Sequence, residues 1–287
     1  MIIAVFGDVH GNLAAMFDCC LDWQNRYAKQ IDLILQTGDM GLWCSFNEAD
    51  KATPAAFCLP LRLSTQVEAA GESRSGGCVN DKTELAAAPY LSGKKTAPIE
   101  TWFINGNHEN FSLLANKENQ PVDPARLGEA SRSPTGRIIF LSPGSVREFR
   151  KDKEILRVAA LGGIEYRFGK YPVPSNARVQ KYLHPPSLED LQKTNSKVDV
   201  LLLHDAPLNK GLRTKFPTGS KRITELIQTL QPRFAFYGHY DDPPEPFYVG
   251  PTLCVGTNFA RAKRIPGRDG AMGILRTDTW QFRFVEP

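Results

Sequence analysis

Short apolar runs and longer amphipathic stretches follow one another along the chain. Ile2–Phe6 is a continuous apolar run that ends at Gly7, which predicts a buried strand. From Asn12 to about residue 29, apolar residues recur at helical spacing, and Asn12 suits the N-cap of that helix. A second apolar run at 32–37 stops at another Gly-Asp pair. The N-terminal part is therefore expected to form a β-α-β unit with acidic residues at both strand ends.

The same two patterns predict further strands and helices downstream. Strands are expected at 101–104, 137–141, 145–149, 155–161, 198–203 and 234–237, and helices at 187–193 and 220–230, with short strands continuing to Phe284. Strands outnumber helices, and several end in residue types that bind metals. Sites in open α/β sheets are built beyond the carboxyl ends of the strands. The pattern favours an α/β protein of α+β type, with two packed sheets flanked by helices.

Two stretches break this order. Residues 65–97 are rich in Gly, Ser, Ala and charge, with few large apolar side chains, and residues 116–136 form a second such stretch. Both are predicted to be mobile insertions outside the core. No internal repeat is visible, so residues 1–287 are expected to form a single domain.

Composition adds little to this picture. The chain has 287 residues, of which 41% are hydrophobic, and a formal net charge of +4, which allows an anionic substrate but does not require one. Its six cysteines form no CxxC pair, so they are expected to be core or incidental thiols in a reducing compartment. The N-terminus does not resemble a signal peptide and no apolar run reaches membrane-spanning length. We expect a cytoplasmic protein without a membrane partner.

Five polar clusters follow the predicted strands. They are Gly7-Asp8-Val9-His10-Gly11, Gly38-Asp39, Gly106-Asn107-His108-Glu109, His204 and Gly238-His239. Glycine lets the backbone turn sharply and leaves space for an ion beside its ligand. Carboxylate, imidazole and amide donors together suit Mn, Fe or Zn, and a carboxylate that bridges two cations gives a site that activates water against a phosphoryl group. Each cluster alone is equally typical of a turn or a structural histidine. All five, in order at strand ends, indicate a metal site.

This series resembles the calcineurin-like metallophosphoesterase superfamily, whose pattern is DxH, GD, GNH(E/D), H and GHxH. The resemblance runs from Phe6 to about His239 and implies a β-sandwich of two mixed sheets flanked by helices. It also implies two divalent metal ions (Mn, Fe or Zn). By this resemblance Asp8 and His10 bind the first metal, Asp39 bridges both, and Asn107, His204 and His239 bind the second. His108 then lies beside the metals, where it protonates the leaving oxygen or stabilises transition-state charge.

The last motif departs from that pattern. GHxH requires a histidine at residue 241, whereas the chain reads Gly238-His239-Tyr240-Asp241. Asp241 is one possible replacement ligand, because a carboxylate oxygen also suits Mn or Fe. Three protein ligands plus water, as in the serine/threonine phosphatase branch, are another. A weakened first site in an inactive protein is the third.

Sequence features also bear on the branch of the superfamily. Gly38-Asp39-Met40 lacks the Asp-Arg-Gly signature of the serine/threonine phosphatases. Segments 46–50, 90–98, 161–164 and 203–207 are more similar to RNA lariat debranching enzymes. Those enzymes, however, characteristically carry Cys at the position of Asp8 and a further C-terminal domain. The resemblance therefore implies a shared scaffold, with debranching as an alternative.

We expect a hydrolase that acts on a phosphate ester, with a phosphodiester of a nucleotide or nucleic acid as the favoured substrate. Two basic clusters would steer such a substrate if they flank the metal edge: Lys210, Arg213, Lys215, Lys221 and Arg222, and Arg261, Lys263, Arg264 and Arg268. Tyr166, Phe168, Tyr171 and Tyr182 would stack on bases. The competing hypothesis is a non-catalytic scaffold that binds partner proteins. The oligomeric state is left open.

Overall fold

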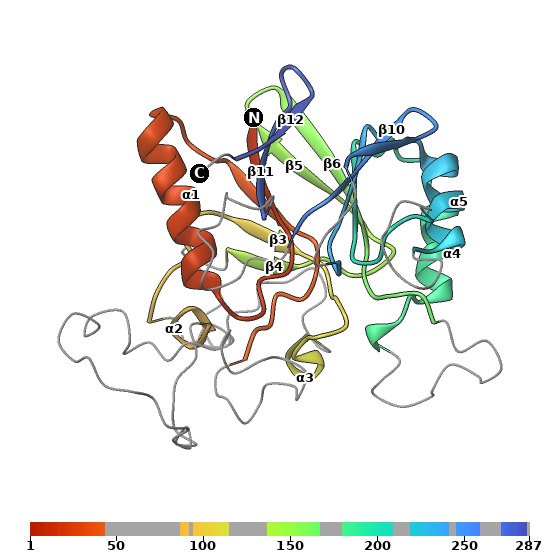
Figure 1. Cartoon of the computed structure of the whole chain (residues 1–287), viewed down its shortest axis with the longest axis horizontal. Helices are drawn as coiled ribbons and strands as arrows, with labels where there is room; N and C mark the ends of the chain where they lie inside the picture. Colours follow the sequence, from red (N-terminus) through yellow and green to blue (C-terminus); the bar gives the residue numbers. More distant parts are fainter. Residues whose placement is uncertain are drawn as a thin grey trace.

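A computed structural model describes residues 1–43, 87–91, 94–114, 137–166, 180–208, 219–240, 245–258 and 271–285. Two six-stranded sheets pack face to face between helices (Figure 1). The first sheet has the order β12-β11-β1-β2-β3-β4 and contains β1 (Ile2–Phe6), β2 (Leu33–Gln36), β3 (Thr101–Phe103), β4 (Ile138–Phe140), β11 (Met272–Arg276) and β12 (Gln281–Phe284). The second has the order β5-β6-β7-β8-β10-β9 and contains β5 (Val146–Lys151), β6 (Glu154–Leu161), β7 (Val200–Leu203), β8 (Phe234–Tyr237), β9 (Phe247–Val249) and β10 (Thr252–Gly256).

The apolar strands are buried on both faces, which explains why they contain unbroken apolar runs. In β1, Ile3 and Val5 point into the core between the two sheets, whereas Ala4 and Phe6 join the cluster under α1 (Leu13–Tyr27). A third cluster lies between the second sheet and the helices α4 (Pro185–Lys193) and α5 (Lys221–Leu230). The layers are therefore helix, sheet, sheet and helix (Figure 1).

Strand direction brings the predicted ligands to one edge. β1, β2, β3 and β4 are parallel, and so are β6, β7, β8 and β10. The antiparallel pairs involve the flanking strands β11 and β12 of the first sheet and β5 and β9 of the second. Because parallel strands end at the same edge, the loops after β1, β2, β3, β7 and β8 all start there. Both sheets are mixed, so the predicted fold class is confirmed.

The predicted strands and the three long helices are present, with small shifts at their ends. α1 stops at Tyr27 and is followed by Ala28 in the left-handed conformation. Asn12 occupies the N-cap position, but its side chain makes no capping hydrogen bond, and only its carbonyl accepts the Met16 N–H. No helix in the described part of the chain is long and apolar enough to cross a membrane.

The predicted insertion at 65–97 needs a correction at its C-terminal end. α2 (Ala88–Leu91) lies within it, and Ala87, Leu91 and Ala97 are buried in the cluster that includes α1. Short apolar side chains in a Gly/Ser/Ala-rich stretch pack there against a helix, a possibility that composition alone does not reveal. Residues 65–86 lie outside the described residues, as does the second predicted insertion at 116–136. α3 (Phe111–Leu114) was not predicted.

Candidate metal centre

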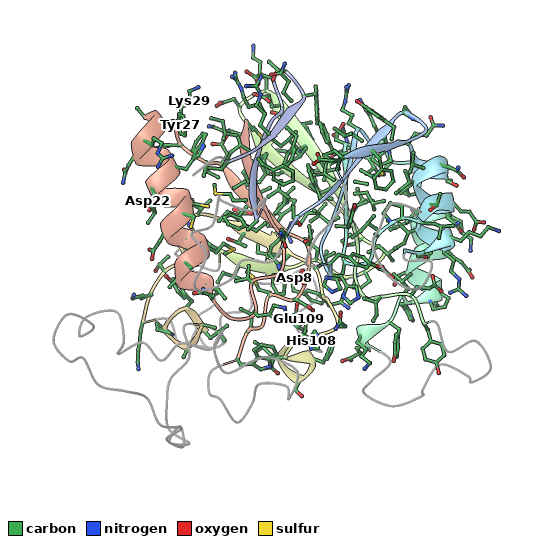
Figure 2. The ribbon with its side chains drawn as sticks, in the orientation of Figure 1. Asp8, Asp22, Tyr27, Lys29, His108 and Glu109 are labelled. Atoms are coloured by element: carbon green, nitrogen blue, oxygen red, sulfur yellow. The ribbon has the colours of Figure 1, made fainter. Side chains whose placement is uncertain are left out.

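Acidic and imidazole side chains from both sheets meet at the carboxyl edge. Asp8 follows β1, Asp39 follows β2 and His204 follows β7, and each offers a donor atom within 4.8 Å of the other two. All three side chains are buried. Figure 2 shows Asp8 near His108 at the end where the central strands stop. Two buried carboxylates are costly unless a positive charge compensates them, which fits a cation at this point.

Three of the predicted ligand residues have a strained backbone conformation. His10, Asp39 and His239 have φ values of 47°, 56° and 68°, in the left-handed region that costs a non-glycine residue about 1–2 kcal/mol. The other described non-glycine residues with positive φ terminate helices or lie in hairpin turns: Ala28, Asp152, Gln231 and Trp280. Such strain at strand ends persists where the surroundings hold it, and it is concentrated at functional sites.

Glycines beside the ligands leave room that no side chain would leave. A Cβ on Gly106 would overlap Oδ1 of Asp39, and one on Gly238 would overlap Oδ1 of Asp8. A Cβ on Gly38 would lie 2.6 Å from Nδ1 of His204. The predicted reason for glycine in these motifs, close approach to a ligand side chain, is therefore present in the structure.

The hydrogen bonds of His204 define which of its nitrogens faces the centre. Its Nδ1 lies 2.9 Å from the carbonyl oxygen of Thr37, which only accepts, so Nδ1 carries the proton. Burial lowers the pKa of His204 from 6.5 to about 4, so the ring is neutral at pH 7 and Nε2 has a lone pair. That Nε2 lies 3.0 Å from Oδ1 of Asn107 and 3.5 Å from Oδ1 of Asp39. Three acceptor atoms from three strand ends thus face one another, an arrangement that a cation stabilises.

The remaining predicted ligands surround this group. Nε2 of His10 lies 3.9 Å from Oδ2 of Asp8 and 3.7 Å from Oδ2 of Asp39. The His239 ring lies 5.1 Å from the His204 ring, and its backbone N–H donates to Oδ1 of Asp8 at 3.0 Å. The structure therefore gathers the described residues that the sequence nominated.

His108 lies at the border of the cluster. Its backbone N–H donates to Oδ1 of Asp39 at 2.7 Å, and its ring is centred 5.7 Å from the ring of His10. It is partly exposed, unlike the buried His204. Asp241, the possible replacement ligand, belongs to the segment 241–244, which lies outside the described residues.

The donor set fits a divalent metal centre. Asp8, Asp39, His10, His204, His239 and Asn107 would hold the metal through carboxylate, imidazole and amide atoms, the ligands that Mn, Fe and Zn accept. When bound, such a cation supplies an activated water and neutralises charge on a phosphoryl group.

Two supporting residues escaped the sequence prediction. The Gln36 amide donates to the carbonyls of Gly7 and Gly38 and accepts the Gly38 N–H, which ties the loops after β1 and β2 together. The buried Glu109 carboxylate accepts the N–H groups of Met40 at 2.8 Å and Gly41 at 3.0 Å. Burial, and next the charge of Asp39, raise the pKa of Glu109 to about 8. Gln36 could have been found only as a polar residue within a buried apolar strand. Glu109 could have been found as the last residue of the Gly-Asn-His-Glu cluster.

A separate network supports the second sheet. The buried Asp205 accepts the hydroxyl of Tyr240 at 2.6 Å, the N–H of Glu165 at 2.9 Å and the N–H of Ala206 at 2.8 Å. Tyr240 packs edge-on against the His239 ring, with centroids 5.0 Å apart. Asp205 thus fixes the residue beside one imidazole ligand and directly follows the other.

Comparison with known proteins places this site in a family. The chain is 25% identical over 264 residues to the lariat debranching enzyme of Mus musculus, a match that covers 83% of this chain and 41% of that protein. The corresponding Arabidopsis thaliana enzyme is 22% identical over 317 residues, which covers 98% of this chain and 67% of that protein. The chain therefore spans about two fifths of the length of the animal relatives it matches.

A solved structure shares the fold at lower identity. The protein TT1561 of Thermus thermophilus superimposes with a TM-score of 0.53 at 15% identity, over 98% of this chain and 96% of that one.

The model of the calcineurin-like phosphoesterase family matches residues 1–241, a range that includes every predicted ligand. This confirms the superfamily resemblance. The chain belongs to the calcineurin-like phosphoesterase family.

Proposed function

We propose that this chain is a two-metal phosphodiesterase that hydrolyses a nucleotide or nucleic-acid ester. In this proposal Asp8 and His10 hold the first metal, Asp39 bridges both, and Asn107, His204 and His239 hold the second. The observation that carries the proposal is that three acceptor atoms meet at this edge. Oδ1 of Asn107 lies 3.0 Å and Oδ1 of Asp39 lies 3.5 Å from Nε2 of His204. A cation relieves their mutual repulsion while His204 stays neutral.

His108 is the proposed proton donor to the leaving oxygen. Its backbone is fixed by Asp39 and its ring is partly exposed, so the imidazole reaches a substrate while the chain around it stays in place. With Mn added, the wild-type protein should hydrolyse an aryl phosphodiester, and His108→Ala should lower kcat by about 10² or more, the usual contribution of a general acid. Metal content of the variant, measured by atomic emission, should match the wild type.

Exposed Tyr248 offers a control for the loss of a ring. Tyr248→Ala removes an aromatic side chain from the edge strand β9, outside the predicted ligand set, and should leave Mn-dependent turnover of a small aryl diester within about twofold of wild type. Equal kcat values for wild type and His108→Ala would contradict the proposed role of His108. Fewer than about one equivalent of tightly bound metal after Mn loading would instead favour a non-catalytic scaffold.

Branched RNA is the second candidate substrate. The similarity of 22–26% to lariat debranching enzymes favours it, although it establishes kinship and not substrate. The described members of the basic clusters, Lys221 and Arg222, are exposed and pair with Glu225 and Glu165, and the others lie outside the described residues. A screen of the Mn-loaded protein against branched RNA, linear RNA, nucleotides and aryl phosphates separates the two. Cleavage of branched RNA alone would favour debranching.

A further inference from the structure

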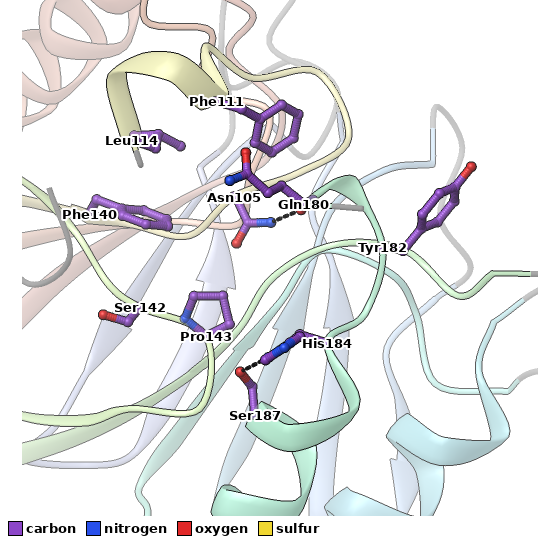
Figure 3. Close-up of a pocket in the computed structure, with 10 residues that line it drawn as sticks. All are labelled: Asn105, Phe111, Leu114, Phe140, Ser142, Pro143, Gln180, Tyr182, His184 and Ser187. Atoms are coloured by element: carbon purple, nitrogen blue, oxygen red, sulfur yellow. Dashed lines mark hydrogen bonds between the residues drawn. The ribbon is translucent and has the colours of Figure 1, made fainter. Parts of the chain in front are cut away.

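We propose that a cavity beside the metal loops binds a neutral, planar heterocycle, the base of the nucleotide ester. The inference rests on the proposed function and names a part of the substrate. The cavity has a volume of about 480 Å³, within the range of about 300–1,000 Å³ that is usual for small-molecule sites. Figure 3 shows its walls coming from α3, β4, the loop after β4 and the segment that leads into α4.

The cavity adjoins the metal centre through one short segment. Asn105 lines the cavity and Asn107 is a proposed ligand, so their Cα atoms are at most about 7 Å apart. The Asn105 carbonyl accepts the Gly163 N–H at 2.9 Å, and its Nδ2 donates to the Gln180 carbonyl at 2.9 Å. These bonds join β3 of the first sheet to the chain that follows β6 of the second. The segment that lines the cavity therefore continues directly into a loop of the metal centre.

The walls select for a flat, uncharged ligand. Phe111, Phe140 and Tyr182 provide aromatic surface, and Leu114 and Pro143 add aliphatic surface. No Lys, Arg, Asp or Glu is among the described residues that line the cavity, so these residues bring no carboxylate, ammonium or guanidinium charge to it. Aromatic side chains on which bases stack contribute to binding in this way without reading sequence.

Polar groups at the cavity suit the edge of a heterocycle. The His184 ring is oriented by a 2.8 Å hydrogen bond between its Nδ1 and the Ser187 hydroxyl. Oδ1 of Asn105 is buried and has no hydrogen-bond partner among the described residues, and Figure 3 shows it directed toward the side of Phe140 and Pro143. A buried acceptor without a donor costs free energy, and an exocyclic amino N–H of a base such as adenine that reaches this amide after a small rotation would remove that cost. A plain hydrocarbon ligand would not.

The test compares two esters that differ only in the base. Adenosine 5′-phosphate methyl ester and 1-O-methylribose 5-phosphate methyl ester, which has methoxy in place of the base, are given to the Mn-loaded full chain, and product is followed by chromatography. Wild type should prefer the adenosine ester, mainly through a lower KM. Phe111→Ala should reduce the ratio of the two kcat/KM values by about tenfold or more, the usual effect of removing one stacking partner. Tyr248→Ala, which truncates an aromatic side chain that is 70% exposed and lines no part of the cavity, should leave the ratio unchanged.

The outcomes separate the two proposals. If wild type hydrolyses neither ester nor any aryl diester, the proposed function fails. If it hydrolyses both esters with equal kcat/KM, or if Phe111→Ala lowers kcat for both alike, the cavity inference is overturned and the proposed function stands. A ratio lowered in Phe111→Ala and unchanged in Tyr248→Ala supports the cavity as the base site.

Discussion

The two sheets contribute to the candidate metal centre in different ways. The first sheet supplies the carboxylates, the amide and the imidazole of His10, on loops that are tied to one another by Gln36 and Glu109. The second sheet supplies the imidazoles His204 and His239, and both take their orientation from the first sheet. His204 donates to the Thr37 carbonyl, and the His239 N–H donates to Asp8. The first-sheet loops are thus fixed among themselves, whereas the second-sheet ligands are placed by docking of the sheets.

This difference predicts which parts of the site a substitution in either sheet displaces. A change in the first-sheet loops should disturb the imidazoles as well, because their partners are Thr37 and Asp8. A change in the second-sheet network around Asp205 should leave the first-sheet loops in place, because Gln36 and Glu109 hold them. Three measurements test this asymmetry.

Gly106→Ala should have the largest effect. The new Cβ would overlap Oδ1 of the buried Asp39, so either the loop after β2 or the loop after β3 must move. Displacement of about 1 Å in a catalytic group costs about 10² in rate, and we expect at least that loss in kcat together with lost Mn binding. Titration calorimetry with Mn and turnover of an aryl diester measure both. Gly250→Ala is the control: its Cβ meets nothing within 4 Å, although the φ of 59° strains an alanine there by about 1–2 kcal/mol. Equal losses of Mn binding and turnover in the two variants would contradict the steric argument.

A comparison of Glu109→Gln with Tyr240→Phe tests the support of the first-sheet loops against that of the second-sheet network. The Gln side chain has a single acceptor oxygen, so it cannot receive the N–H groups of Met40 and Gly41 on separate oxygens as Glu109 does. Residues that orient metal ligands typically contribute about 10–100-fold, and we expect a loss of that size in kcat and Mn affinity. Tyr240→Phe removes the 2.6 Å hydrogen bond to Asp205 and the acceptor of the Gly219 N–H at 3.2 Å. It keeps the ring against His239, so its loss should be below about tenfold.

Glu148→Gln, at an exposed residue, serves as the control for a Glu-to-Gln replacement far from the site. Circular dichroism and thermal melts of each variant separate altered support from unfolding. A Tyr240→Phe loss as large as that of Glu109→Gln would show that the second sheet supports the site as firmly as the first.

The gathering of the candidate ligands at one edge was predictable from the sequence, and the residues that support them were not. Asp8, Asp39, His204 and His239 each follow an apolar run, most of them next to glycine, and that local signal corresponds to a strand end at the shared edge. Gln36 and Glu109 act on backbone groups 29 and 69 residues away, at Gly7 and Met40, and such pairings appear only after the strands are ordered in the sheet. For the same reason neither α2 nor the cavity beside Asn105 was predicted, because each is defined by contacts between distant segments.

The pH dependence of the metal-free protein gives the smallest and most specific test, because it reports on one second-sheet imidazole. The pKa of His204 is lowered from 6.5 in an exposed chain to about 4 in the folded protein by burial. Between these values the unfolded state binds a proton that the folded state does not. The contribution of His204 to stability is therefore complete above about pH 6.5 and is lost as the pH falls toward about 4.

Urea denaturation of chelator-treated protein at several pH values should show this loss, with a slope of at most about 1.4 kcal/mol per pH unit from this group. Glu109 contributes with the opposite sign, since its pKa is raised from 4.5 to about 8 and its folded form holds the extra proton in that window. The difference between wild type and His204→Asn cancels the Glu109 contribution and isolates the imidazole. An unchanged difference between pH 7 and pH 5 would mean that burial does not lower the pKa of His204. If the contribution of His204 instead increases as the pH falls from 7 to 5, the ring is protonated in the folded protein. Nε2 would then donate to Asn107, and the argument for a cation from facing acceptors would fail.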